Sequence, residues 1–232
     1  MVFFAANVLG AGLARRLGRG RNRQRLGAGF GSDTNAQTSP TQTVYQLDLP
    51  NATSGNAMED SMRLLAGMIR EPKLSKANLA TEVPIVLAER RERNGPERRI
   101  SETTREVMFA GQRLATRSPI GTVETLQAAT AQAVQAFHKR WYRPDKAVVV
   151  VVGDADPRLL AEMVERNFAD WKVPGAPAAE PDFGDPKAPA GADPANPVGE
   201  TRVIVEPGQA RALTYAIMRP WRQVTDNIEY NR

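Results

Sequence analysis

The strongest folding signal in this sequence is a run of β-branched residues from Lys146 to Gly153, KAVVVVVG. An uninterrupted apolar run of this length, rich in valine, predicts a strand that is buried on both faces. A chain that contains such a strand needs a sheet to receive it and helices to cover that sheet. We therefore expect a structure in which helices and strands share one core.

The pattern before this run predicts a β-hairpin over Gly29–Pro50, because Thr43, Tyr45, Leu47 and Leu49 alternate with polar residues. Apolar residues at helical spacing, with Pro and Gly as breaks, predict the other elements. Helices are expected over residues 56–70, 75–93 with a kink at Pro84, 97–114, 130–142 and 157–168. Further strands are expected over residues 201–207 and 212–220. This order predicts an α+β protein.

Composition excludes several kinds of active site. There is no cysteine, so thiol catalysis, Cys-ligated metal sites and disulfides are absent. The only histidine is His138, so a site that needs two histidines cannot come from this sequence alone. A Ser-His-Asp triad remains arithmetically possible.

The net charge of +5 comes from one segment, since residues 15–25 hold six arginines and 5 − 6 leaves −1 for the rest. This Arg- and Gly-rich start has three possible interpretations. It is an organellar presequence, an RNA- or DNA-binding segment, or a solvated basic loop. No aromatic residue is interleaved to stack on bases, so the solvated loop is favoured. We expect no nucleic-acid partner.

Three stretches, in this order, resemble the M16 (insulinase/pitrilysin-like) family of zinc metallopeptidases. They are FGSDTNAQTSPTQTVYQLDLP, LATEVPIVLAERRER and SPIGTVETLQAATAQAVQAFHKRWYRPDKAVVVVVGD. The resemblance implies an M16-type half-domain, with a mixed or antiparallel sheet and packed helices, incomplete at both ends. It also implies zinc as cofactor, a peptide or protein as substrate, and a second M16-type domain or subunit as partner, with no membrane span.

The resemblance also implies site residues. Glu89 matches the zinc-ligand glutamate of the family and Glu82 an accessory acidic residue of the site. They are seven residues apart, two helical turns, so they share one helix face if the Pro84 kink is small. Without the family match, the two would be read as solvated acids on an amphipathic helix.

The family's His-x-x-Glu-His motif, which supplies two zinc ligands and the general base, is absent. In the family this motif runs into Met and an apolar stretch, and the present sequence opens Met1-Val2-Phe3. The expectation is a chain that begins just after the motif, holds an incomplete zinc site and is inactive by itself. A frameshift, an insertion and true divergence of residues 4–28 all remain open.

Substrate binding is expected on the hairpin. In the family the strand that carries TNAxT pairs with the substrate backbone, which assigns Asn35, Ala36 and Gln37 to substrate binding. The alternative is an ordinary edge strand whose asparagine stabilises a turn.

The expected domains are an atypical segment over 1–28, an M16-like N-terminal domain over 29–172, a Pro/Ala-rich linker over 173–200 and the start of a C-terminal-type segment over 201–232. An alternative function is that of a non-catalytic M16-like partner or substrate-binding subunit. The family likeness points to a bacterial periplasm or envelope, or to an organelle.

Overall fold

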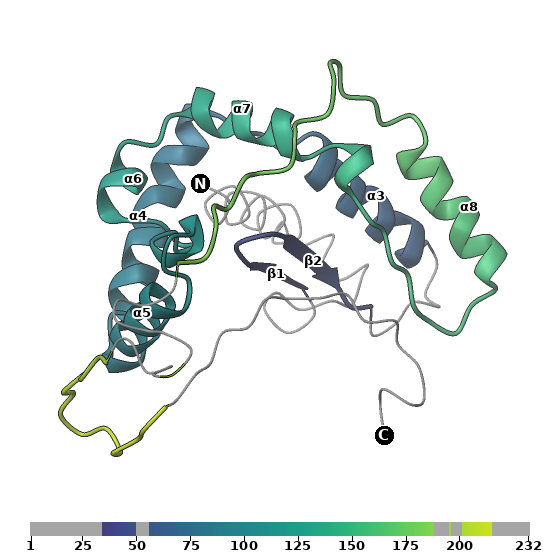
Figure 1. Ribbon diagram of the computed structural model, residues 1–232. Coiled ribbons are helices and arrows are strands. Elements are labelled where there is room, and N and C mark those ends of the chain that lie inside the picture. Colours follow the sequence, from purple (N-terminus) through teal and green to yellow (C-terminus); the bar gives the residue numbers. More distant parts are fainter. Residues whose placement is uncertain (1–33, 50–55, 188–194, 196–200, 215–232) are drawn as a thin grey trace. The chain divides into compact units, whose positions relative to one another are not determined.

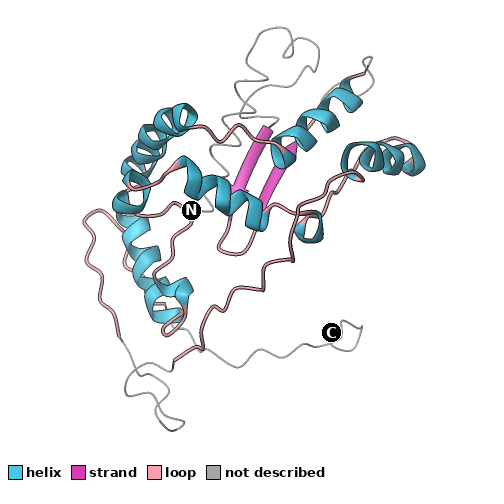
Figure 2. Cartoon of the chain, turned by 90° about the horizontal axis from the view of Figure 1, so that it is seen from above, coloured by secondary structure: helices cyan, strands magenta, loops and turns pink. Residues whose placement is uncertain are grey.

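A computed structural model describes residues 34–49, 56–187, 195 and 201–214 of the 232 residues. Helices dominate this part of the chain, which holds a single two-stranded sheet (Figures 1 and 2). The chain divides into two compact units, one made of residues 1–93 and 117–182 and the other of residues 94–116 and 183–232. The expected segment 1–28 lies outside the described residues.

The hairpin forms as its alternating pattern predicts. Strand β1 (Thr34–Thr38) pairs antiparallel with β2 (Thr43–Leu47), with Ala36 opposite Tyr45. Ser39 closes the turn, because its hydroxyl accepts the backbone N–H of Thr41 at 3.3 Å and of Gln42 at 3.2 Å. Thr43, Tyr45 and Leu47 are half-buried and the residues between them are exposed, so one face of the hairpin packs on the protein.

The first unit contains five α-helices among its described residues, and all but the short one over Val123–Gln127 were expected from the sequence pattern. They are α3 (Ala57–Arg70), α4 (Lys76–Glu92), α6 (Val123–Gln127), α7 (Ala131–Trp141) and α8 (Pro157–Phe168). Side-chain oxygens of Ser75, Thr122, Thr130 and Asp156 accept backbone N–H groups at the starts of the last four. The helix α3 contacts α8, where Arg70 at its end forms an ion pair of 2.7 Å with Asp170.

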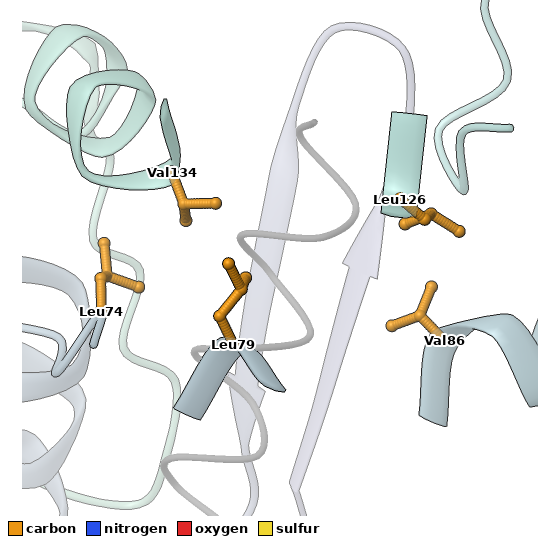
Figure 3. Packing of buried hydrophobic residues seen from close by; sticks show 5 residues of the cluster. All are labelled: Leu74, Leu79, Val86, Leu126 and Val134. Atoms are coloured by element: carbon orange, nitrogen blue, oxygen red, sulfur yellow. The ribbon is translucent and has the colours of Figure 1, made fainter. Parts of the chain in front are cut away.

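The core of this unit lies between α4, α6 and α7. Its buried members are Leu74, Leu79, Val86, Leu126 and Val134 (Figure 3). Tyr45 from the hairpin and Tyr142 from the end of α7 pack against it. Tyr45 also packs against a second, smaller cluster formed by Ala57 and Met68 of α3. Strand β2 is therefore fixed to both clusters through one side chain.

The second unit contains α5 (Pro96–Met108) and the short 3₁₀ helix η1 (Arg113–Ala115). The expected helix over 97–114 therefore ends early. Gly111 lies between the two with φ of +83°, and a Cβ there would come within 2.6 Å of the backbone oxygen of Asp185. Only glycine fits both this backbone angle and this close approach, so the chain leaves the helix before it.

The predicted strand over Lys146–Gly153 is wrong. Pro144–Lys146 forms the 3₁₀ helix η2, and residues 147–152 belong to no helix or strand. Val148, Val150 and Val152 are 88%, 76% and 91% exposed, rather than buried. A strand needs a neighbour for its backbone hydrogen bonds, and within the described residues no strand pairs with this segment.

The expected strand over 201–207 is wrong for the same reason, and its Val203 and Val205 are each 84% exposed. Most of the other expected strand, 212–220, lies outside the described residues. The α+β class is confirmed, with far more helix than strand. A search of the described residues finds no helix long and apolar enough to cross a membrane.

Candidate functional site

The two candidate acidic residues lie on α4, which continues through Pro84 as one helix of 17 residues. Glu82 is 3% exposed and shares the buried face of α4 with Leu79 and Val86. Glu89 comes two turns after Glu82 and one turn after Val86, so it continues the same face toward the end of the helix. The expectation that one helix face carries both carboxylates is compatible with this arrangement.

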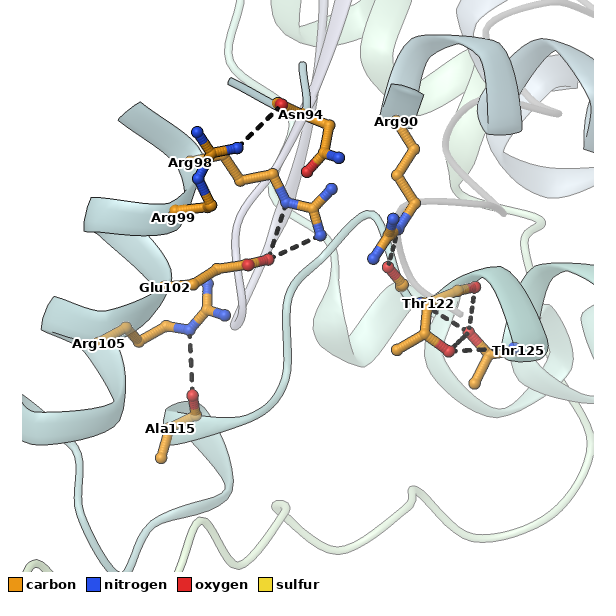
Figure 4. Close-up of polar contacts among 10 residues, drawn as sticks. Arg90, Asn94, Arg98, Arg99, Glu102, Arg105, Ala115, Thr122 and Thr125 are labelled. Carbon is orange, nitrogen blue, oxygen red and sulfur yellow. Dashed lines mark hydrogen bonds and ion pairs between the residues drawn. The ribbon is translucent and has the colours of Figure 1, made fainter. Parts of the chain in front are cut away.

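The Glu89 carboxylate is partly accessible. Its side chain is 27% exposed and forms an ion pair of 2.9 Å with Arg93, one turn further along. The end of α4 is held in place by Arg90, whose Nε donates to the carbonyl oxygen of Gly121 at 3.1 Å (Figure 4). Gly121 precedes α6, which contacts α4. The helix α6 begins with a capping box formed by Thr122 and Thr125. Glu89 thus extends from a packed helix, and its present partner is an exposed arginine.

The candidate substrate-binding residues lie on β1. Asn35 and Gln37 are exposed, whereas Ala36 is half-buried opposite Tyr45. The Oδ1 atom of Asn35 accepts the backbone N–H of Ala36 at 2.8 Å, a local contact that also fits the alternative reading of an edge strand. Within the described residues β1 pairs with β2 alone, so its other edge has no strand beside it.

Two tyrosines join this hairpin to the helices, and no local sequence pattern predicts their contact. The hydroxyls of Tyr45 and Tyr142 lie 2.7 Å apart, 97 residues apart in sequence. Burial raises the pKa of both phenols, so the pair stays neutral and hydrogen-bonded at ordinary pH. Because Tyr45 of β2 packs on the cluster that contains Val86, the hairpin and α4 share one core, and Ala36 of β1 lies opposite Tyr45.

His138 contacts Tyr142 and already has a hydrogen-bond partner. Its Nε2 lies 2.7 Å from the carbonyl oxygen of Ile69, and its ring stacks on Tyr142 with centroids 4.6 Å apart. Burial lowers the pKa of His138, while the contact with Ile69 acts in the opposite direction. A neutral imidazole that donates Nε2–H to Ile69 satisfies this geometry.

The described residues do not make up a complete zinc site. Catalytic zinc takes three protein ligands. Among the residues that the structure describes, no three His, Cys, Asp or Glu side chains lie close enough to hold a metal ion. The sequence has one histidine, and it faces Ile69. Glu89 could supply one carboxylate ligand, and the others would have to come from elsewhere.

Comparisons with known proteins agree with the sequence resemblance. Residues 23–117 match the family model described as insulinase (peptidase family M16), and residues 128–230 match the model described as the peptidase M16 inactive domain. The probable zinc protease PqqL of Escherichia coli is 30% identical over 155 residues, which cover 67% of this chain and 16% of that protein. A chloroplastic stromal processing peptidase of Arabidopsis thaliana is 28% identical over 186 residues, 74% of this chain and 14% of that protein.

Solved structures show the same fold. The periplasmic protease PqqL of E. coli superposes with a TM-score of 0.65 at 25% identity, over 79% of this chain and 21% of that one. The ferredoxin protease FusC, solved in complex with Arabidopsis ferredoxin, gives a TM-score of 0.64 at 24% identity over 78% and 21%. In the sequence alignment, this chain spans about one sixth of the curated PqqL protein. The two family models, these relatives and the shared fold establish that the chain belongs to the M16 family of peptidases.

Proposed function

We propose that this chain contributes part of the active site of a zinc-dependent metalloendopeptidase and does not hydrolyse peptide bonds by itself. Glu89 is the zinc ligand that it supplies, and Glu82 is the accessory acidic residue. One observation carries the proposal, namely that both carboxylates are built into one uninterrupted helix at a spacing of two turns. Retention of this pair is expected of a chain that completes a metal site.

The edge of β1 is the proposed substrate-binding element. Its outer edge, which has no strand beside it in the described part of the chain, can accept an extended peptide as a further strand, with Asn35, Ala36 and Gln37 along the contact. The shared core of the hairpin and α4 supports this assignment, because a peptide on β1 would then be held in a fixed relation to Glu89. Because Glu82 is buried against the same core, its carboxylate would also be held in a fixed relation to a peptide on β1.

The two histidines and the general base are proposed to come from outside this sequence, which lacks a His-x-x-Glu-His motif. A second M16-type domain or subunit is the proposed partner, and a peptide or protein the substrate. The structure of FusC with ferredoxin supports a protein substrate for this family. The proposed location is the periplasm, where the similar PqqL is described.

Complementation tests this proposal. The full chain with zinc and a fluorescence-quenched peptide should show no hydrolysis. Joining an M16-type segment that carries a His-x-x-Glu-His motif to its N-terminus should restore zinc-dependent hydrolysis. In that fusion Glu89→Gln should lower the rate by at least about 100-fold, because removal of one ligand leaves too few to hold the metal.

The matched control is Glu92→Gln, an exposed glutamate on the same helix, which should leave the rate unchanged. Zinc-dependent hydrolysis by the chain alone would contradict the proposal, and so would a fusion indifferent to Glu89→Gln.

A non-catalytic, substrate-binding subunit is the second candidate. The match of residues 128–230 to the M16 inactive domain favours it. It predicts that the chain binds extended peptides and that a fusion bearing the motif still gains no hydrolysis, even though circular dichroism shows it to be folded.

A further inference from the structure

Tyr142 joins the hairpin to the end of α3 through a chain of contacts. Its hydroxyl lies 2.7 Å from that of Tyr45 on β2, and the two rings are tilted with centroids 6.3 Å apart. The Tyr142 ring also stacks on His138 of α7, whose Nε2 lies 2.7 Å from the carbonyl oxygen of Ile69 in α3. Three side chains therefore connect α3, α7 and β2 through specific contacts.

The hydrogen bond between the two tyrosines gives the hairpin a fixed point. Tyr45 also packs against both hydrophobic clusters, but apolar contact is non-directional and allows a strand to slide over its neighbours. A hydrogen bond between hydroxyls has a preferred length of about 2.7–2.8 Å and a preferred angle. The Tyr142 hydroxyl therefore restricts where Tyr45, and with it β2, can lie.

Tyr45 connects the two candidate elements of the site. In the ladder of the hairpin it is directly opposite Ala36, the middle residue of β1, so β1 moves with it. It also packs against the cluster that contains Val86 of α4, three residues before Glu89. A shift of Tyr45 would therefore move the proposed peptide-binding edge relative to the helix that carries Glu89.

We propose that Tyr142 is a positioning residue, which sets β1 against α4 by holding Tyr45 in place. This inference rests on the proposed function, in which β1 binds the peptide and α4 supplies Glu89. Tyr142 packs behind the hairpin and acts on the reaction through Tyr45 alone. Such an effect can be large, because a misplacement of about 1 Å at a reacting centre can slow a reaction by about 100-fold.

Removing one hydroxyl should disturb this arrangement more than removing both. Tyr142→Phe keeps the ring that stacks on His138 but leaves the buried Tyr45 hydroxyl without this partner. A buried hydroxyl without a hydrogen bond is unfavourable, so the hairpin should shift until that group reaches water. Tyr45→Phe/Tyr142→Phe leaves neither hydroxyl of the pair behind. We therefore expect the double variant to lie closer to wild type than the single one.

Kinetics of the fusion described above test the effect on the reaction. Tyr142→Phe should lower kcat by about ten-fold and leave KM within about two-fold, because the edge of β1 is itself unaltered. Tyr45→Phe/Tyr142→Phe should recover most of the lost kcat. The matched control is Met163→Ala, a buried position of α8 outside both clusters, which should lower the unfolding midpoint at least as much and leave kcat unchanged. An unchanged kcat in Tyr142→Phe, or an equal loss in Met163→Ala, would overturn the proposal.

A distance measurement on the full chain does not depend on activity. The chain has no cysteine, so Gln37→Cys and Glu92→Cys place one spin label on β1 and one on α4, both at exposed positions. Double electron–electron resonance should give one narrow distance distribution, which Tyr142→Phe broadens or displaces and the double phenylalanine variant restores. An identical distribution in Tyr142→Phe would refute the positioning role. The expected distributions together with an inactive wild-type fusion would instead refute the proposed function, while upholding the placement of β1 by Tyr142.

Discussion

Strand β2 and the segment Ala147–Val152, here called the valine segment, carry the same kind of pattern and have different structures. In both, exposed and half-buried residues alternate over five positions, Thr43–Leu47 and Val148–Val152. Only β2 is a strand, because a turn of four residues, Ser39–Gln42, returns the chain beside it as a partner. Alternation thus determines which side chains face the protein, whereas a neighbouring backbone determines whether a strand forms.

The two regions also differ in what their inner faces contact. Tyr45 of β2 packs on both hydrophobic clusters and reaches Tyr142 through its hydroxyl. Val149 and Val151 are only half-buried and pack against neither cluster. The hairpin is therefore anchored to the core by a large side chain, and the valine segment lies outside that core.

The largest effect on stability is expected when a buried valine, rather than an exposed one, is shortened to alanine. Val86 is 1% exposed and Val150 is 76% exposed. Val86→Ala should lower the free energy of unfolding by about 2 kcal/mol, through lost burial and a cavity. Val150→Ala should change it by less than about 0.5 kcal/mol at low protein concentration. Urea denaturation followed by tryptophan fluorescence measures both, and equal losses would contradict the assignment of Val86 to the core.

Removing one hydroxyl should test the anchor of the hairpin. Tyr142→Phe leaves the buried Tyr45 hydroxyl without its partner and should cost about 1–2 kcal/mol in the free energy of unfolding. The double variant Tyr45→Phe/Tyr142→Phe removes both hydroxyls and should recover part of that loss. Strict additivity in this double-mutant cycle would show that the two side chains do not interact.

The next largest loss of stability is expected from a change in the turn Ser39–Gln42, which brings β1 beside β2. Ser39→Ala removes the side-chain oxygen that accepts two backbone N–H groups and should cost about 0.5–1 kcal/mol. Amide hydrogen exchange of residues 43–47 should rise, while that of the valine segment stays the same. A uniform rise in both regions would mean that the turn stabilises the whole unit and not the hairpin.

The smallest effect is expected from pH, through His138. Its pKa is lowered by burial below the ordinary value of 6.5, so the unfolded chain binds a proton more readily than the folded one. Stability should be complete above pH 6.5, fall as pH decreases toward the lowered pKa, and level off below it. Urea midpoints between about pH 7.5 and 5 should show this slope, which His138→Gln should remove while keeping a donor for Ile69. Since the chain has one histidine, a slope that persists in His138→Gln would assign the effect to another group.

Most helices were predictable because their signals are local. Asn56, Ser75, Thr130 and Asp156 stand immediately before α3, α4, α7 and α8, and the apolar spacing that follows each of them gives the buried face. The early end of α5 was not predictable, because it depends on the approach of Asp185 to Gly111 across 74 residues of sequence. Position in the chain does not reveal a contact of that kind.

The candidate site was partly predictable as well. Spacing alone put Glu82 and Glu89 on one face, and α4 keeps that spacing. Their roles, and those of Asn35, Ala36 and Gln37, stay predictions until the complementation experiment is done. The ion pair of Glu89 with Arg93 joins residues one turn apart, so spacing can predict it. The hydrogen bond from Arg90 to Gly121 joins distant parts of the sequence, so spacing cannot predict it.

The sequence by itself determined the family, the hairpin, the helices and the lack of a second histidine, since all of these follow from residues close together or from composition. Only the tertiary structure decided that Tyr45 meets Tyr142, that His138 faces Ile69, and that three of five consecutive valines remain exposed. The physical reason is the same in each case. A side chain or a strand completes its interactions with whatever the fold brings beside it, and neither propensity nor periodicity specifies that neighbour.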